Sequence, residues 1–436
     1  MKVLALAIVP PHMEVSGALR AAIELSARLQ GACDIEFARL STRNRESESP
    51  QGLPILEVRT GLPLDVVWRR LPNALRTPLY RSDLPARIAR GSLGTDREPG
   101  AGWDLVHLHN PMPTLELRRV ARACKRAGIP YVISTHGFTE MASGGASYGL
   151  GPARRVAWRL LVMNPLREVV RGAAGVLGLS PADLPFLDSV GVPRERISFA
   201  PNGVPRSERH KDDDELSTVL ARYEIPPSDG RPRALFLGNH TANKGLPVLL
   251  EAFLSSEQPF VLIVGGSQRP AVDYAGYRER CRPGQSIVFT GLIEECDLNA
   301  IFTTSEIFVF PSLADTFPLA VLEAMEHGLP VIATRVGGIP YQVDTKSGLL
   351  VEAGSVTELR EAFERLASDP GKAAEMGAQA QGRVHQEFTW ERAAELALAA
   401  YRGVLNKANR VGSPSGPLNR NFVDAVHQVD TKRNQI

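Results

Sequence analysis

The chain has 436 residues, which is too long for one compact core and fits two domains of about 200 residues each. Hydrophobic residues make up 43% and charged residues 22% of the chain, a globular composition that excludes disorder over most of its length. The four cysteines are widely scattered and form no C-x-x-C pair, which excludes a disulfide scaffold and a thiolate zinc site and suits a reducing cytosol.

Charge is unevenly divided along the chain. Residues 1–200 hold 26 Lys and Arg against 18 Asp and Glu, a net charge of +8. The remaining residues hold 24 against 30, a net charge of −6. The asymmetry indicates two domains with different partners.

The first apolar run, at residues 3–9, follows Lys2 as in a short signal peptide. Because Pro10, Pro11 and Glu14 follow closely and no small-residue cleavage site does, we predict a buried first strand instead. No uncharged apolar stretch approaches the length needed to cross a bilayer. We therefore expect a cytoplasmic protein, at most peripheral to the inner face of a membrane.

Short apolar runs alternate with helical patterns in both halves. In the first half a helix is predicted at 17–29, and strands are predicted at 2–9, 104–108, 131–135 and 175–179. In the second half the predicted strands are 233–237, 259–264, 286–289, 306–310 and 330–333, and the predicted helices are 245–254, 294–303, 316–327 and 356–368. This alternation predicts an α/β fold of two doubly wound parallel sheets with helices on both faces.

A polar stretch between residues 202 and 232 separates the two halves and reads as a solvated linker. The tail after about residue 406 is polar and contains Gly412, Pro414, Gly416 and Pro417, so we expect it to be disordered. We place an N-terminal domain at 1–205, a C-terminal domain at 206–390, a helix that packs back towards the N-terminal domain at 391–407 and a disordered tail at 408–436.

Ligands of doubly wound domains bind at the carboxyl ends of the strands, and one such loop is rich in polar residues. After the strand that ends at Phe310, Asp315 or Thr316 is expected to cap a helix that contains Glu323. The next loop contains Gly337-Gly338, which would let a ligand approach the backbone. A helix N-terminus at this edge favours an anion.

Asp315 and Glu323 are eight residues apart, one before the helix and the other about two turns into it. Taken alone, a capping Asp and an ordinary helix Glu explain the pair. Paired carboxylates at a ligand site are the alternative. The surrounding sequence decides between them.

That sequence, PSLADTFPLAVLEAMEHGLPVIATRVGGIP (311–340), resembles the E-x7-E motif of the retaining GT-B-fold glycosyltransferases of glycosyltransferase family 4. LFLGNHTANKGLPVLLEAF (235–253) is similar to the G-R-x4-K-G phosphate loop of this family. Further matches are VGVPRERISFAPNGV (190–204), VFTGLI (288–293), WDLVHLHNP (103–111) and ISTHGF (133–138). The resemblance covers residues 1 to about 405, with almost no motif at 40–100.

The resemblance implies two Rossmann-like domains that face a central cleft, with a nucleotide-sugar in the C-terminal domain and an acceptor in the N-terminal domain. It implies that Glu323 binds the ribose hydroxyls of the donor and that Lys244 grips its diphosphate. Asp315 and His136 would lie at the donor sugar. The other implied donor-binding positions are Gly17, Asn239, Leu292, Thr316, Phe317, Pro318, Leu319, Gly337 and Gly338.

Three positions depart from the family pattern. Asp315 stands where Glu is usual, and Gly17 stands alone where the family has Gly-Gly, although Ser16 can cap the helix that follows. Asn239 replaces the phosphate-loop Arg, so one of two charged contacts with the diphosphate is lost. We expect His240 or an arginine of the N-terminal domain to compensate.

The implied activity is that of a retaining hexosyltransferase-type enzyme (EC 2.4). It moves a sugar from a UDP- or GDP-linked donor to a hydroxyl acceptor in cell-surface polysaccharide, glycolipid or other glycoconjugate biosynthesis. Lys244 and backbone amides would stabilise the leaving diphosphate, so no metal or other cofactor is expected. These backbone amides are those of Gly337, Gly338 and the start of the predicted helix 316–327.

Other interpretations remain. A nucleotide-sugar epimerase on the same fold, a pyridoxal-phosphate-dependent sugar phosphorylase and a non-catalytic nucleotide-sugar-binding protein are the alternatives. Asp212-Asp213-Asp214 matches the D-x-D pattern of metal-dependent sugar transferases, but we interpret it as linker. His107 and His109 share one face of a strand, and no acidic or thiol ligand accompanies them to hold a metal.

Residues 153–171 form a basic amphipathic segment in which arginines interleave with Trp158, Leu160, Leu161 and Met163. Such a segment can lie on an anionic membrane, which would favour a lipid-linked acceptor. A core helix whose arginines face water fits equally well. No nucleic-acid partner is expected.

Overall fold

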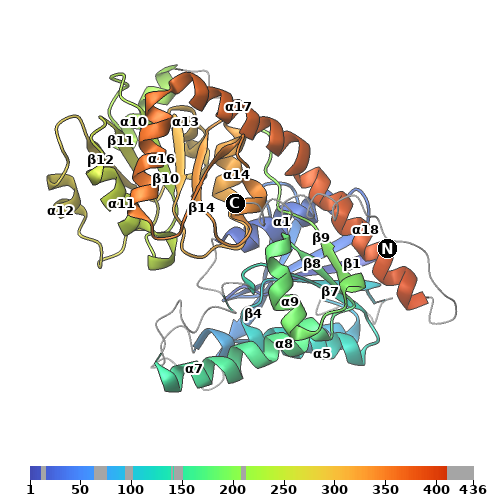
Figure 1. The fold of residues 1–436 in the computed structure, drawn as a ribbon. Helices are drawn as coiled ribbons and strands as arrows, with labels where there is room; N and C mark the ends of the chain where they lie inside the picture. Colours follow the sequence, from blue (N-terminus) through green and yellow to red (C-terminus); the bar gives the residue numbers. More distant parts are fainter. Residues whose placement is uncertain are drawn as a thin grey trace.

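Two mainly parallel sheets, one in each half of the chain, organise the fold, as Figure 1 shows. The structure, a computed structural model, describes residues 1–10, 16–62, 76–93, 102–138, 141, 151–207 and 213–409. The tail predicted to be disordered lies outside the described residues from 410 onwards. The predicted fold class, a doubly wound α/β architecture in two domains, is confirmed.

The N-terminal sheet has the order β3-β4-β2-β1-β6-β7-β8-β9, with β5 paired to β4. Pairing is parallel except for β3 and β5, which run antiparallel to β4. Its strands are β1 (Lys2–Ala7), β2 (Asp34–Ser41), β3 (Arg45–Glu48), β4 (Pro54–Gly61), β5 (Arg81–Ser82), β6 (Leu105–His109), β7 (Tyr131–Ser134), β8 (Gly175–Gly178) and β9 (Ile197–Phe199). The strand order reverses between β1 and β6, so a ligand site is expected beside the carboxyl ends of these two strands.

Helices cover both faces of this sheet, and its central strands are buried on both sides. They are α1 (Gly17–Leu29), α4 (Leu84–Arg90), α5 (Thr114–Arg126), α7 (Pro152–Trp158), α8 (Asn164–Arg171) and α9 (Leu184–Val190). A π-helical segment, η2 (Arg159–Met163), joins α7 to α8. Short 3₁₀ turns are η1 (Thr77–Leu79), η3 (Pro181–Asp183) and η4 (Arg194–Arg196).

The C-terminal sheet is parallel throughout and has the order β12-β11-β10-β13-β14-β15. Its strands are β10 (Arg233–Leu237), β11 (Val261–Gly265), β12 (Ser286–Gly291), β13 (Ile307–Phe310), β14 (Val331–Thr334) and β15 (Gly348–Val351). Its helices are α10 (Asp213–Arg222), α11 (Leu246–Ser255), α12 (Tyr274–Glu279), α13 (Leu298–Thr303), α14 (Leu319–Glu326), α15 (Ile339–Gln342) and α16 (Val356–Ser368), with 3₁₀ turns η5 (Ala242–Lys244) and η6 (Glu295–Asp297). Here the strand order reverses between β10 and β13.

The predicted linker contains a helix. Asp213 and Asp214 are the first residues of α10, and Asp212 lies outside the described residues. Acidic residues in a first helical turn are stabilised by the helix dipole. The charge run is therefore a helix start, and the interpretation of this part as plain linker is wrong.

After the C-terminal sheet, the described part of the chain crosses back over the N-terminal sheet. Helices α17 (Pro370–Glu387) and α18 (Trp390–Asn409) run from the C-terminal lobe to the N-terminal lobe in Figure 1. On α18 the Tyr401 hydroxyl lies 2.6 Å from Nδ1 of His107, and Glu391 accepts a hydrogen bond from Arg28 at 2.9 Å. The exact domain boundaries stay predictions. None of the helices in the described part of the chain combines the length and apolarity that crossing a bilayer requires.

Candidate functional site

Segments that follow strands of the two sheets contact one another across the domains. Arg20 near the start of α1 contacts Glu323 of α14, and Asn202 Nδ2 donates to the carbonyl of Phe317 at 3.4 Å. A Cβ added at Gly338 would lie 3.1 Å from Ser180 Oγ, so the loops after β8 and β14 also touch. These contacts bring loops of both sheets to one place, where doubly wound folds bind ligands.

The loop after β10 holds Lys244 against the loop after β13. Gly245 has φ +71°, and a Cβ there would lie 2.0 Å from the carbonyl oxygen of Pro311, so only glycine permits this approach. The carbonyl of Asn243 accepts hydrogen bonds from the amide of Leu313 at 2.7 Å and from Ser312 Oγ at 3.0 Å. The lysine is thus presented by two loops that are fixed to each other.

Lys244 forms an ion pair with Asp315, and its Nζ lies 5.4 Å from the ring centroid of Phe310. Both side chains are largely buried, with 23% of Lys244 and 10% of Asp315 exposed. Two residues assigned to donor binding by resemblance are therefore direct neighbours, although 71 residues separate them in sequence.

Helix α14 begins at Leu319, later than predicted, with Pro318 in the N-cap position and no capping hydrogen bond from that side chain. Because the Asp315 carboxylate is held by Lys244, it does not cap the helix. Thr316 Oγ1 is buried and has no hydrogen-bond partner among the described residues. The prediction that Asp315 or Thr316 caps this helix is wrong.

Gly337 and Gly338 serve packing between loops. Gly337 has φ +51°, and a Cβ there would lie 1.7 Å from the carbonyl oxygen of Asp315. The amide of Gly338 donates to the carbonyl of Thr316 at 2.8 Å. The prediction that the Gly338 amide faces a ligand is therefore wrong, because that amide already has an acceptor. Contact through Gly337 stays a prediction.

Glu323 meets a cation from the other domain. Arg20 Nη1 lies 2.5 Å from Glu323 Oε1, and Arg20 Nη2 lies 3.5 Å from Glu295 Oε1. Burial opposes the charge on Arg20, but the two carboxylates outweigh it and raise the pKa of the guanidinium above its usual range. Arg20 and Glu295 were not among the predicted site residues. A lone arginine on a helix resembles any surface arginine, and only its place beside the β1–β6 switch point could have indicated a role.

The remaining predicted positions differ in their surroundings. Gly17 begins α1, and Ser16 Oγ accepts a hydrogen bond from the amide of Leu19 at 3.2 Å, which confirms the predicted cap. Asn239 is exposed after β10, and Leu292 after β12 is 72% exposed. Phe317 is buried in the core with its ring 5.8 Å from that of Phe388, so only its backbone can contact a ligand.

Three histidines lie buried at the carboxyl edge of the N-terminal sheet. Burial lowers the pKa of His136 to about 4 and that of His107 to about 3, and it lowers the pKa of His109 well below its usual value. All three imidazoles are thus neutral at pH 7. His107 uses both ring nitrogens, towards Ser134 Oγ at 2.7 Å and Tyr401, which leaves neither for a metal.

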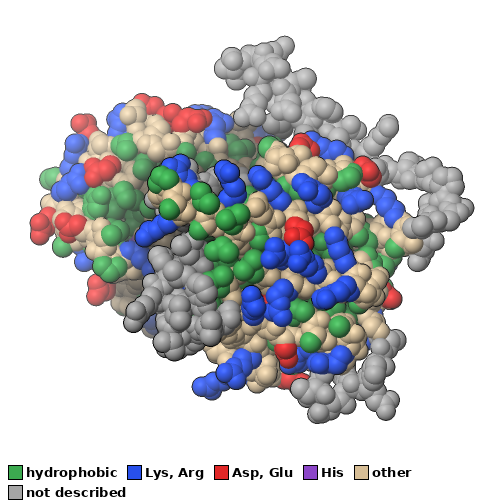
Figure 2. Space-filling model, turned by 90° about the horizontal axis from the view of Figure 1, so that it is seen from below, with side chains coloured by type: hydrophobic (Ala, Val, Ile, Leu, Met, Phe, Trp, Pro, Cys, Tyr) green, Lys and Arg blue, Asp and Glu red, His purple; other side chains and the backbone are tan. Residues whose placement is uncertain are grey.

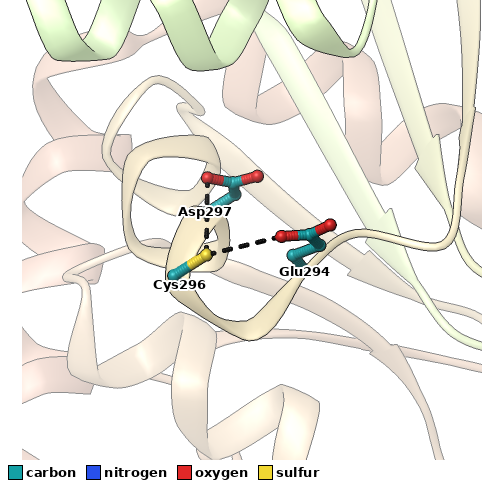
Figure 3. A group of neighbouring side chains, drawn as sticks. All are labelled: Glu294, Cys296 and Asp297. Atoms are coloured by element: carbon teal, nitrogen blue, oxygen red, sulfur yellow. Dashed lines mark hydrogen bonds between the residues drawn. The ribbon is translucent and has the colours of Figure 1, made fainter.

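Glu294, Cys296 and Asp297 form the one group in the described chain whose spacing would suit a metal ion, shown in Figure 3. Asp297 Oδ2 accepts hydrogen bonds from Arg222 at 2.6 Å and from the Tyr223 hydroxyl at 2.7 Å. Desolvation and the two neighbouring carboxylates raise the pKa of the Cys296 thiol, so it stays protonated. We interpret the group as an anchor for α10 and assign it no ligand.

Models of known protein families match both halves of the chain. The model of Glycosyltransferase Family 4 matches residues 15–208, and the model of Glycosyl transferases group 1 matches residues 231–369. The D-inositol 3-phosphate glycosyltransferase of Arthrobacter sp. (strain FB24) is 26% identical over 402 residues, covering 88% of each chain.

Solved structures share the fold at lower sequence identity. Sucrose-phosphate synthase from Thermosynechococcus elongatus superposes with a TM-score of 0.68 at 20% identity, covering 93% of this chain and 100% of that one. Anabaena Alr3699/HepE, solved in complex with UDP-glucose, superposes with a TM-score of 0.65 at 17% identity, covering 94% and 100%.

Proposed function

The chain belongs to the GT-B-fold glycosyltransferases of glycosyltransferase family 4, and we propose that it moves a sugar from a UDP- or GDP-linked donor to a hydroxyl acceptor with retention of configuration. The observation that carries this proposal is the pairing of Lys244 with Asp315 and of Arg20 with Glu323 where the two sheets meet. Such a site offers cations to a diphosphate and carboxylates to a diol.

In the proposed complex, Lys244 leaves Asp315 for the diphosphate, which carries more charge than one carboxylate. Glu323 then accepts hydrogen bonds from the ribose hydroxyls. Because one homologous fold was solved with UDP-glucose, UDP-sugars are the first donors to test. The exposed side chain of Leu292 is proposed to lie near the base.

The reaction needs no protein nucleophile in this proposal. The bond between the sugar C1 and the β-phosphate oxygen breaks while the acceptor oxygen bonds to C1 from the same face. The acceptor proton passes to a β-phosphate oxygen. Lys244 stabilises the leaving diphosphate, so we expect turnover without added metal and in the presence of a chelator. Neutral His136 would hydrogen-bond a hydroxyl of the donor sugar.

The acceptor is proposed to be lipid-linked, because one face of the N-terminal domain suits an anionic membrane. Figure 2 shows Lys and Arg spread over this face, with apolar side chains between them and few acidic ones. Val156 and Leu160, one turn apart on α7 and η2, are 57% and 58% exposed. Trp158 and Met163 are buried in the core, so the segment serves the core and leaves a small apolar patch among arginines.

The test is a panel of nucleotide-sugars. Binding at about a hundredfold excess over Kd stabilises the folded state by about 2.7 kcal/mol, a rise in Tm of roughly 5–10 °C for domains of this size. A donor that binds is then incubated with and without acceptor lipids. Isomerisation of the donor alone would indicate an epimerase, and binding without hydrolysis or transfer would indicate a non-catalytic protein. No shift with any UDP- or GDP-sugar would contradict the proposed donor class.

A further inference from the structure

The phosphate loop after β10 has one cation where two are expected. Lys244 is present, but Asn239 brings no charge. The neighbouring His240 does not replace it, because the side chain is only 4% exposed and burial lowers the pKa of its imidazole. Its Nδ1 lies 2.8 Å from the Tyr274 hydroxyl. His240 is therefore neutral at pH 7 and engaged in the C-terminal domain.

Arg20 brings a cation from the other domain to α14, the helix that follows Asp315, the ion-pair partner of Lys244. It lies near the start of α1, beside the β1–β6 switch point, and its guanidinium reaches across to α14. Its side chain is 37% exposed, and its guanidinium contacts the carboxylates of Glu323 and Glu295. The 3.5 Å contact with Glu295, itself 77% exposed, is weak, and the guanidinium can change partners at low cost.

Resting on the proposed function, we propose that Arg20 is a donor-binding residue that takes the place of the missing phosphate-loop arginine. When a nucleoside diphosphate enters, the guanidinium exchanges the Glu323 carboxylate for diphosphate oxygens. Arginine suits this exchange because its planar fork binds carboxylates and phosphates with the same geometry. The exchange frees Glu323 for the ribose, so one movement completes both contacts.

This arrangement places the two cations on opposite sides of the ligand. Lys244 lies in η5 of the C-terminal domain, and Arg20 lies on α1 of the N-terminal domain. The diphosphate would thus bridge the domains, whereas an arginine at position 239 would bind it from one domain alone.

The test measures binding of UDP or GDP, whichever binds the unaltered chain, by calorimetry in Arg20→Gln. Losing a charge-assisted contact should weaken binding about ten- to hundredfold. The uncharged nucleoside, uridine or guanosine, should bind as well as before or better, because Glu323 is no longer occupied. Arg20→Lys should retain part of the diphosphate affinity. Asn239→Arg should restore it in the Arg20→Gln background, and both gains should shrink as salt rises.

Arg28→Gln is the matched control. Arg28 lies on the same helix and pairs with Glu391, away from the site, so the change in charge is the same. Its diphosphate affinity should equal that of the unaltered chain. If Arg20→Gln keeps its diphosphate affinity within about twofold, Arg20 only positions Glu323 and the proposal is wrong.

Lys244→Gln separates this inference from the proposed function. If Lys244→Gln weakens diphosphate binding and Arg20→Gln does not, the inference alone fails. If neither substitution weakens it, the donor does not bind between these loops and the proposed site fails as well.

Discussion

Replacing Glu323 by Gln tests whether this carboxylate serves ligand or fold. The substitution keeps the size and polarity of the side chain and removes its charge. In the ligand-free protein it weakens the contact with Arg20, whose side chain is 37% exposed against 15% for Glu323. Ion pairs this close to solvent contribute about 0.2–1 kcal/mol, so Tm should fall by at most about 4 °C.

Donor binding should suffer much more. Charged hydrogen bonds from a carboxylate to two ribose hydroxyls become neutral ones, a loss of about 1.5–3 kcal/mol. Affinity for the nucleoside diphosphate should fall about ten- to hundredfold, and kcat/KM at least as much. Calorimetry and initial rates at equal amounts of folded protein measure both.

Glu326→Gln provides the contrast on the same helix. The Glu326 side chain is 2% exposed, and its carboxylate accepts from the amide of Ser207 at 3.0 Å and lies 2.9 Å from His385 Nε2. A carboxamide there would turn an NH₂ group towards a donor, which should cost about 1.5–3 kcal/mol of stability while kcat/KM of the folded protein stays unchanged. If Glu323→Gln instead showed the larger fall in Tm with intact turnover, Glu323 would be structural and our assignment would be refuted.

Three further predictions concern the N-terminal domain. Leu160→Asp should abolish flotation with anionic liposomes at low salt, while the free energy of unfolding changes by no more than about 0.5 kcal/mol. Flotation of the unaltered chain should weaken at high salt. If the unaltered chain does not float at low salt, the membrane proposal is wrong. The pKa of His136 is about 4 in the folded state and 6.5 is its ordinary value, so the unfolded chain binds a proton at higher pH than the folded one. The free energy of unfolding is therefore unaffected by this histidine above pH 6.5 and falls as the pH drops towards 4. His136→Gln should therefore reduce the acid-induced loss of unfolding free energy by up to about 3 kcal/mol, and an unchanged pH profile in urea titrations would contradict the burial argument. Tyr401→Phe leaves Nδ1 of His107 buried without its partner and should cost about 1–3 kcal/mol, measured as a fall in Tm; an unchanged Tm would show that this contact does not anchor α18.

Strong local patterns predicted the elements with the fewest conflicts. The predicted ranges 17–29, 233–237 and 356–368 coincide with α1, β10 and α16. In each of them, apolar periodicity or a continuous apolar run agrees with what the sheet requires. The loops after β10 and β13 were also predictable, because their glycines, Lys244 and Asp315 lie within short continuous motifs.

Strands with buried charge escaped prediction. In β4 the Glu57 carboxylate is buried and accepts hydrogen bonds from Arg39 at 2.5 Å, Arg45 at 2.7 Å and Ser41 at 2.8 Å. Burial alone would raise the pKa of Glu57, but these partners lower it to about 2. The arginines come from β2 and β3, so the charges within 34–61, where no strand was predicted, satisfy one another once the strands pair.

Pairing of opposite charges also explains why the sequence did not indicate a role for Arg20 in the site. In the ligand-free protein Lys244 pairs with Asp315, and Arg20 pairs with Glu323. In the proposed complex the ligand separates both pairs. The second pair joins residues 303 positions apart, on helices of different domains. No local sequence pattern predicts such a contact. Arg20 and Arg28 lie on one helix, and only the position of the other domain distinguishes their roles. A site built from exchangeable pairs avoids unpaired charge when empty, and its ligand must replace both partners to bind. Affinity then depends on the difference between the ion pairs of the ligand-free protein and the charged contacts with the ligand. Salt weakens both sets of contacts. Because Arg20→Gln has one charged ligand contact fewer, raising the salt concentration should reduce its nucleoside diphosphate affinity less than that of the unaltered chain.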